Sequence, residues 1–408
     1  MSPSMSVTQN NTDTRLLLYG TILCFPLAIN YGLWFFGSAD IIKTFTLYSA
    51  MLIMAVFFVT NNTRDFVPIK FYLGTLIIIS LSSPTFAWDA RSIWLFHAKR
   101  IWIDHNLFAP LDGYASWSHN DYPVFVPSLS ATLALCIHAW NEVLPKFANV
   151  LVAVPALMVL FAPLQGITAR LLCGSLILFI CGGSILNGLM DGLVALYTTA
   201  VSIIIFSFWK FEEVNQHRYL WLTALFLMTS ILGVLKNEGV LAIACVIMAA
   251  EIIGSLYGMK RPPLVMYGVM VLSLLPIITW EMACANYHVV NDIVGWPMFA
   301  RLKSRVRSIN SYQQILTILS LQKILLVPLV LHITTGRLKI NCPMWLFVSC
   351  VAALYMIALL AIYLSTPYSL HWHLMNSADR TIQPIGLMLG YYALLQLNIR
   401  YAKQRPTG

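Results

Sequence analysis

Apolar runs long enough to cross a lipid bilayer recur along almost the whole of this 408-residue chain. A helix needs about 20 mostly apolar residues to cross the ~30 Å hydrocarbon core of a membrane. Hydrophobic residues make up 59% of the chain and charged residues only 10%, which excludes an ordinary soluble enzyme. The sequence therefore predicts an all-α polytopic membrane protein.

We expect about twelve transmembrane helices. Their ranges are 16–36, 41–60, 70–86, 146–163, 171–186, 193–209, 219–236, 239–257, 264–284, 313–332, 343–364 and 383–399. The further apolar stretch 127–140 is short for a span, so we expect it to lie in the interface or to re-enter the membrane on the side from which it came.

The distribution of basic residues predicts the orientation. If the N-terminus is cytoplasmic, every inside loop is short and contains Lys or Arg residues, as the positive-inside rule expects. These residues are Arg64, Lys70, Arg170, Lys210, Arg218, Lys260, Arg261, Arg337, Lys339, Arg400, Lys403 and Arg405. Both termini are then cytoplasmic, and a crossing at 127–140 would invert the later loops and remove most of this agreement. The formal net charge of +9 is accounted for by orientation, and no nucleic-acid partner is expected.

Polar groups interrupt the apolar segments at five places, and in this topology all five lie on the outer side. Ionisable residues near hydrocarbon are costly, so by default they indicate a working site. The interruptions are Trp88-Asp89-Ala90, His119 to Pro123, Asp191, Lys236-Asn237-Glu238 and Asp379-Arg380.

The segment 88–105 in the first large outer loop (87–126) predicts an amphipathic interfacial helix. Trp94, Ala98, Ile101 and Trp102 share one helical face, so we expect the helix to lie along the membrane surface with its tryptophans at headgroup level. Asp89 lies at the start of this helix. It either caps the free backbone N–H groups there or serves as a catalytic carboxylate.

The other candidates each allow a structural and a functional interpretation. The loop that contains His119, Asp121 and Tyr122 either hydrogen-bonds to itself or presents a second carboxylate to substrate hydroxyls or a metal ion. Asp191-Gly192 is a common turn pair.

Lys236 and Glu238 either neutralise each other in a tight turn or reach into a wet cavity, where the lysine can hold a phosphate. Arg380 either contacts a phosphate oxygen or pairs with Asp379. The outer loops also hold a basic run, which is either a solvated strip or an anion site for lipid or substrate phosphate. Its members are Arg301, Lys303, Arg305 and Arg307.

The order of these motifs resembles that of a known enzyme family. A Trp-Asp-Ala surface helix with Trp94 and Lys99 precedes a Tyr-Pro-x-x-x-Pro loop, a turn Asp, Lys-Asn-Glu-Gly and a late Asp-Arg. This order resembles the integral-membrane GT-C glycosyltransferases, and most closely the bacterial relatives of protein O-mannosyltransferases and of lipid A aminoarabinose transferase. The resemblance covers roughly 70–400. It divides the chain into an N-terminal tail with two added helices (1–66) and a catalytic core (67–408).

The resemblance implies transfer of a sugar from a polyprenyl-phosphate carrier to a glycan, lipid or protein acceptor outside the cytoplasm. Asp89 matches the family's acidic residue and would deprotonate or orient the acceptor hydroxyl. The family often has two acids at this place, whereas Ala90 follows here, so a divalent metal ion is left open as the one possible cofactor. The implied acceptor contacts are His119, Asp121, Tyr122, Asp191 and Glu238, and the implied donor-phosphate contacts are Lys236 and Arg380, with Arg301 and Lys303 as rivals.

We therefore expect an integral protein of a bacterial cytoplasmic membrane with an extracytoplasmic active site. The alternative function is a transporter or flippase for a lipid-linked or anionic solute, which predicts charges along a path through the membrane rather than at one end of the helices.

Overall fold

The computed structural model describes residues 13–210, 217–257, 264–289, 291, 296–325 and 343–404. Within these ranges the regular secondary structure is entirely helical, and nine helices are long and apolar enough to span a membrane. The chain is therefore a polytopic α-helical membrane protein. The nine are α1 (Thr14–Phe35), α2 (Asp40–Thr60), α3 (Val67–Ser82) with the 3-10 turn before it, α7 (Ile167–Ile177) continued through a π turn into α8 (Gly183–Leu186), α9 (Asp191–Lys210), α11 (Arg218–Leu235), α12 (Asn237–Leu256), α13 (Leu264–Leu272) with α14 (Leu275–Asn286), and α18 (Pro343–Ser365).

Three expected spans are not among the nine. The span expected at 146–163 is α6 (Ala148–Phe161), which is shorter than a typical crossing. The span expected at 383–399 is α20 (Gln383–Gln404), which is long enough but less apolar. The span expected at 313–332 lies partly outside the described residues, which end at Leu325 on this side.

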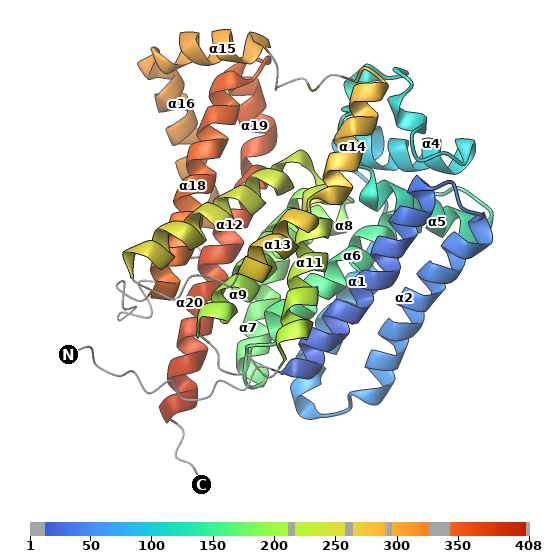
Figure 1. Ribbon diagram of the computed structural model, residues 1–408, viewed down its shortest axis with the longest axis vertical. Helices are drawn as coiled ribbons and strands as arrows, with labels where there is room; N and C mark the ends of the chain where they lie inside the picture. The colour runs from blue at the N-terminus through green and yellow to red at the C-terminus, as the bar shows by residue number, and fades with distance from the viewer. Residues whose placement is uncertain are drawn as a thin grey trace.

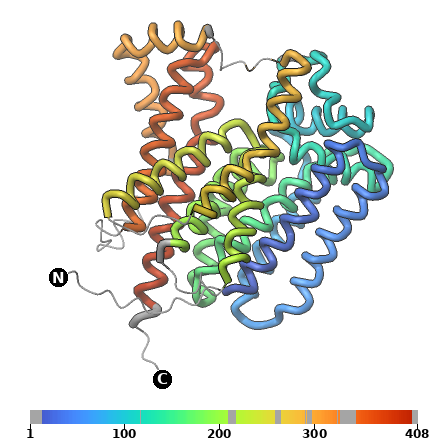
Figure 2. The backbone as a smooth tube through the Cα atoms, in the orientation of Figure 1, coloured from blue at the N-terminus to red at the C-terminus, as the bar shows by residue number. Residues whose placement is uncertain are grey.

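Helix α9 forms the centre of the bundle. It packs against α6, α11, α12 and α20, and nearly all of its length is buried. The hairpin of α1 and α2 covers one flank, and α18 and α20 cover the other (Figure 1). Helix α1 begins and α20 ends at the same end of the bundle (Figure 2), where residues just before α1 and near the end of α20 both contact the loop after α6.

The α1–α2 hairpin is joined to the rest of the bundle by buried polar contacts. Asn30 Nδ2 donates to the Lys43 carbonyl at 2.8 Å, and Trp34 Nε1 donates to Thr132 Oγ1 of α5 (Phe125–Ile137) at 2.8 Å. Thr132 in turn donates to Asn30 Oδ1. Because α1 also packs against α6 and α11, the packing shows no break at residue 66. That these two helices are an addition to a core stays a prediction.

The short apolar stretch 127–140 forms α5, which enters and leaves on one side of the bundle. The loop before α5 contains Asp121, which accepts a hydrogen bond from Asn237 at the start of α12. The loop after it contains Glu142, whose carbonyl accepts one from Thr85 beyond the end of α3. Asp89, which follows α3, and Lys236, which precedes α12, line one cavity, so both ends of α5 lie on the side that carries this cavity.

The expected amphipathic helix is α4 (Leu95–Asp104), which continues from a π turn at Ala90–Trp94. Its apolar face does not point toward lipid as we expected. Trp94, Ala98 and Ile101 are buried, and α4 packs on α5. The reason is that α5 is itself apolar, so the apolar face of α4 is buried against α5 instead of against lipid.

His97 of α4 predicts a pH dependence of stability. The side chain is fully buried, and its Nε2 lies 3.0 Å from Ser118 Oγ. Burial lowers the pKa of His97 from 6.5 to about 4, because the imidazolium is poorly solvated there. An unfolded His97 binds a proton as the pH falls through 6.5, whereas the folded one does not until about pH 4. Stability should therefore be complete above pH 6.5 and decrease by on the order of 3 kcal/mol toward pH 4.

Thermal unfolding of the wild type and of His97→Gln, reconstituted in nanodiscs, measures this effect between pH 7.5 and 4.5. Other groups titrate equally in both proteins, so the difference between the two slopes isolates His97. We expect the glutamine variant to lose clearly less stability on acidification, and identical slopes would contradict the assignment.

Candidate functional site

A cavity of about 570 Å³ opens at the end of the bundle that carries α4 and the N-terminus of α9. Its volume lies within the range of small-molecule sites. The polar residues predicted from the sequence that line it are Asp89, His119, Tyr122, Asp191, Lys236, Glu238 and Arg380. Segments separated by almost the whole length of the chain therefore meet in one place.

Local backbone geometry positions two of the charged residues. Lys236 has an extended conformation (φ −167°, ψ 156°) and is the single non-helical residue between α11 and α12. The turn back is so tight that a Cβ at position 239 would collide with the Leu232 carbonyl, which explains Gly239. Glu238 then lies in the first turn of α12, where the helix dipole favours a negative charge.

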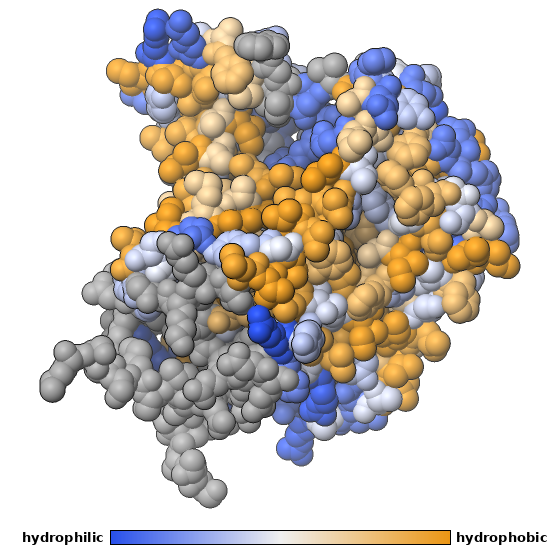
Figure 3. Space-filling view, in the orientation of Figure 1, coloured by the Kyte–Doolittle hydropathy of each residue, from blue (hydrophilic) through white to orange (hydrophobic). Residues whose placement is uncertain are grey.

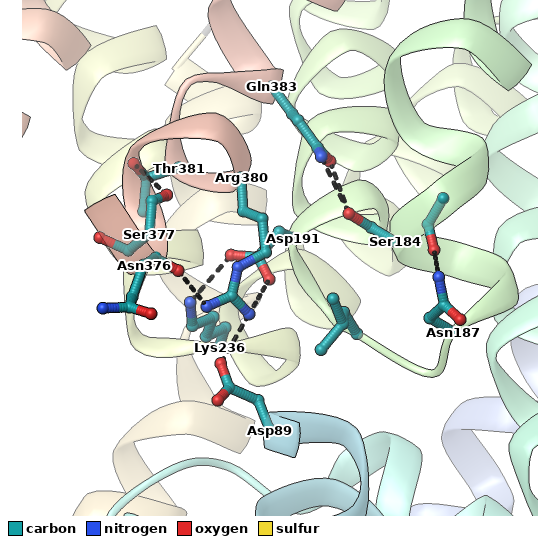
Figure 4. A network of polar contacts seen from close by, with 12 residues as sticks. Asp89, Ser184, Asn187, Asp191, Lys236, Asn376, Ser377, Arg380, Thr381 and Gln383 are labelled. Atoms are coloured by element: carbon teal, nitrogen blue, oxygen red, sulfur yellow. Dashed lines mark hydrogen bonds and ion pairs between the residues drawn. The ribbon is translucent and has the colours of Figure 1, made fainter. Parts of the chain in front are cut away.

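The charged side chains form one network across the cavity wall (Figure 4). Lys236 Nζ lies 3.0 Å from Asp191 Oδ1 and 2.9 Å from Glu238 Oε1. Arg380 Nη1 lies 2.6 Å from Asp89 Oδ2 and 3.8 Å from Asp191 Oδ2. Asp191, in the first turn of α9, thus contacts both cations. Among the Asp, Glu, Lys and Arg residues of the lining, three carboxylates face two cations, which leaves one net negative charge.

Asp89 is an ion-pair partner and not a helix cap. It precedes the π turn, but its side chain makes no capping hydrogen bond there. Its partner Arg380 belongs to α19 (Leu370–Thr381) and pairs with Asp89, rather than with Asp379 beside it in the sequence. Burial tends to lower the pKa of Arg380, but the carboxylates of Asp191 and Asp89 outweigh burial and raise it. Arg380 is therefore a permanent cation of the cavity.

The same balance holds for Lys236, whose side chain is nearly buried. Burial tends to lower its pKa, but the carboxylates of Asp191 and Glu238 outweigh burial and place the pKa well above its ordinary value. Lys236 also lies 5.8 Å above the ring of Tyr122. Its charge is thus already neutralised by two carboxylates.

Asp121 does not line the cavity, although its neighbour Tyr122 does. Its carboxylate accepts hydrogen bonds from Asn237 Nδ2 at 2.8 Å and Asn291 Nδ2 at 2.6 Å, and its carbonyl accepts one from Trp280. Burial raises the pKa of Asp121, although His119 and the two amides act in the opposite direction. Asp121 therefore joins the loop before α5 to the start of α12.

Arg301, Lys303 and Arg305 of the basic run lie in the helix α15 (Trp296–Val306), Arg307 follows it, and none of the four lines the cavity. Arg301 Nε donates to the Ser365 carbonyl at 2.6 Å, and Arg305 donates to the carbonyls of Thr366 and Tyr368. The last carbonyls of a helix lack partners within it, so these arginines cap the C-terminal end of α18. Lys303, on another side of α15, is exposed.

Sequence reasoning missed the aromatic wall that α18 and α19 contribute. Tyr363 of α18, Tyr368 of the loop that joins the two helices, and Trp372 and His373 of α19 line the same cavity as Asp89. Tyr363 lies within an otherwise apolar span, so nothing in the sequence marks it. Burial lowers the pKa of His373 to about 4, with a further contribution from the nearby cations, so its imidazole is neutral at physiological pH.

The cavity residues do not fit a divalent metal ion. Each of the three carboxylates of the lining is already within ion-pair distance of Lys236 or Arg380. Among the residues that the structure describes, no three His, Cys, Asp or Glu side chains are grouped to hold a metal.

Comparisons of the chain with protein-family models, with curated proteins and with solved structures find no match.

Proposed function

We propose that this protein is a membrane glycosyltransferase of the GT-C type that transfers a sugar from a polyprenyl-phosphate carrier to an acceptor on the extracytoplasmic side. The observation that supports it best is the convergence of Asp89, Asp191, Glu238, Lys236 and Arg380 in one cavity at one end of the helices. A lipid-linked donor needs a site of this kind at the membrane surface, with a carboxylate for the acceptor and a cation for the departing phosphate.

The charge balance suggests how the site would work. Both cations are already paired with carboxylates, so an incoming phosphate must replace one of these partners. Asp89 is the more exposed partner of Arg380, with 30% of its side chain accessible against 6% for Asp191. The donor phosphate would therefore take the place of Asp89 on Arg380. This exchange would free Asp89 to accept the proton of the acceptor hydroxyl as the hydroxyl oxygen attacks the anomeric carbon and the carrier phosphate departs.

The same proposal includes the number of membrane crossings and the orientation of the chain. Twelve crossings, with α6, α20 and a span near 313–332 added to the nine, would place both termini in the cytoplasm and the cavity outside. A bacterial cytoplasmic membrane would then present the cavity to the outer leaflet, where a translocated carrier-linked sugar is available.

Cysteine accessibility distinguishes the transferase from the alternative transporter. In a background without native cysteines, Trp372→Cys and Asn376→Cys place thiols in the cavity lining. A membrane-impermeant maleimide should label both thiols from the outside only. It should label Asp65→Cys, which lies before α3 at the end far from the cavity, from the inside only. Labelling of position 372 or 376 from both sides would favour a transporter, whose central site must alternate between the two.

The direct test of the function is a chromosomal deletion in the source organism. We expect one polyprenyl-phosphate sugar to accumulate in the lipid extract and one glycan to lose a sugar residue, and both changes should be reversed by the wild-type gene. An unchanged lipid and glycan profile would refute the proposal.

A further inference from the structure

Four aromatic side chains of the outer loop form a continuous row beside the cavity mouth. The ring centroids of Trp88 and Trp117 are 5.9 Å apart, those of Trp117 and Phe96 are 5.9 Å apart, and those of Phe96 and Tyr114 are 6.3 Å apart. Trp88, Trp117 and Tyr114 are each more than half exposed, at 64%, 55% and 66%. Exposed patches of large apolar side chains commonly mark interaction sites. We call these four residues the aromatic row.

The row is held in place by polar contacts beneath and beside it. Ser118, next to Trp117, hydrogen-bonds to the buried His97 of α4. Asp112 accepts a hydrogen bond from the backbone N–H of Tyr114 at 3.0 Å and pairs with Arg100 at 2.6 Å. A surface that is already ordered loses less conformational freedom when it binds a ligand.

The row faces away from the helix bundle. At 3.6 residues per turn, Phe96 lies about 160° around α4 from Trp94 and Ala98, which are buried. The exposed Lys99 and the ion pair of Arg100 with Asp112 flank the row, a composition that disfavours contact with hydrocarbon. Figure 3 shows hydrophilic residues along the outer edge of the part of the molecule that carries α4, with apolar patches between them.

We propose that the aromatic row binds the sugar rings of an acceptor glycan. A sugar ring presents a face of C–H groups that stacks on an aromatic ring, and hydroxyl edges that hydrogen-bond to charged groups such as Arg100 and Asp112. Tryptophan and tyrosine offer large rigid contact areas for this purpose. Trp88 both lines the cavity and precedes Asp89, so a glycan with its terminal hydroxyl at Asp89 extends directly over the row. This inference rests on the proposed function and specifies its acceptor as a carbohydrate.

Ligand-observed saturation-transfer NMR tests the proposal without any transfer reaction. The wild type is reconstituted in phosphatidylcholine nanodiscs free of sugar detergents and titrated with the tetrasaccharides of cellulose, chitin and maltose. We expect at least one probe to bind, Trp117→Ala to weaken its binding at least tenfold, and Trp117→Phe to keep most of it. Tyr219→Ala is the matched control, because it removes an exposed aromatic ring at the end of α11 that is far from the cavity. It should leave the affinity for the probe unchanged.

Failure of the inference and failure of the proposed function give different results. Asp89→Asn should bind the probe while it loses transfer. Saccharide binding in a protein without transferase activity would refute the function but keep the row. Binding by none of the three probes, or binding that Trp117→Ala does not weaken, would overturn the inference. The inference would also be overturned if lipids brominated in their acyl chains quenched the fluorescence of the wild type more strongly than that of Trp117→Ala, because this difference would place Trp117 in the membrane.

Discussion

Asp89→Asn is expected to lower the rate of sugar transfer by a factor of about 10² to 10⁴, the usual contribution of a positioned general base. Asparagine has nearly the shape of aspartate, and its carbonyl oxygen can still accept the hydrogen bond that Arg380 donates at 2.6 Å. It cannot take a proton from the acceptor. The variant should therefore fold, insert and bind donor, because Arg380 keeps Asp191 as a second partner.

The measurement is transfer of a radiolabelled sugar from the carrier that accumulates in the deletion strain to total membrane glycans, with purified variants at equal amounts. Asp65→Asn, an exposed carboxylate before α3 at the opposite end of that helix, is the matched control and should keep full activity. Transfer by Asp89→Asn at more than a tenth of the wild-type rate would refute the role of Asp89 as base.

Lys236→Met is expected to destabilise the protein by about 3–5 kcal/mol, the usual effect of removing one partner from a buried ion pair. Lys236 is the only charged partner that the described residues provide for Glu238, and the closest one for Asp191. Without it, two carboxylates remain in a nearly buried site with only Arg380 nearby. Methionine keeps most of the volume of the lysine stem, so the loss arises from charge rather than from a cavity.

Unfolding of the variant in nanodiscs, by heat or denaturant, measures this loss. Lys303→Met removes an exposed lysine of α15 and should change stability by no more than about 0.5 kcal/mol. Adding Asp191→Asn to Lys236→Met should restore part of the stability, because one of the unpaired charges is then absent. A stability of Lys236→Met equal to that of the wild type would show that the network is solvated rather than buried.

The helical membrane architecture was predictable from the sequence because its signals are local. The length of an apolar run decides whether it can cross a bilayer, and the shortness of the stretch 127–140 correctly indicated a helix that is not a full span. Ionisable residues within apolar runs are costly unless other polar groups or water surround them. The five polar interruptions therefore predicted which segments would meet. Residues from all five line or adjoin one cavity.

The arrangement of these residues was not predictable, because it depends on contacts between distant segments. Asp89 and Arg380 are 291 positions apart, and neither has a local feature that selects the other over a nearer partner. Asp121 and Tyr122 are neighbours, yet only the tyrosine lines the cavity, since Asn237 and Asn291 hold the carboxylate outside it. The role of the α15 arginines was also open in the sequence. The structure shows that they donate to carbonyls at the C-terminal end of α18, which lies beside them.

The sequence by itself determined that this chain is a bundle of membrane helices, and that the ionisable residues which interrupt its apolar segments lie at one end of them, because hydrophobicity and charge act on each segment separately. Only the tertiary structure decided which carboxylate neutralises which cation, and that the apolar face of α4 covers α5 rather than lipid. Ion pairing and packing act through space over a few ångströms, and the fold alone brings residues from opposite ends of the chain within that distance.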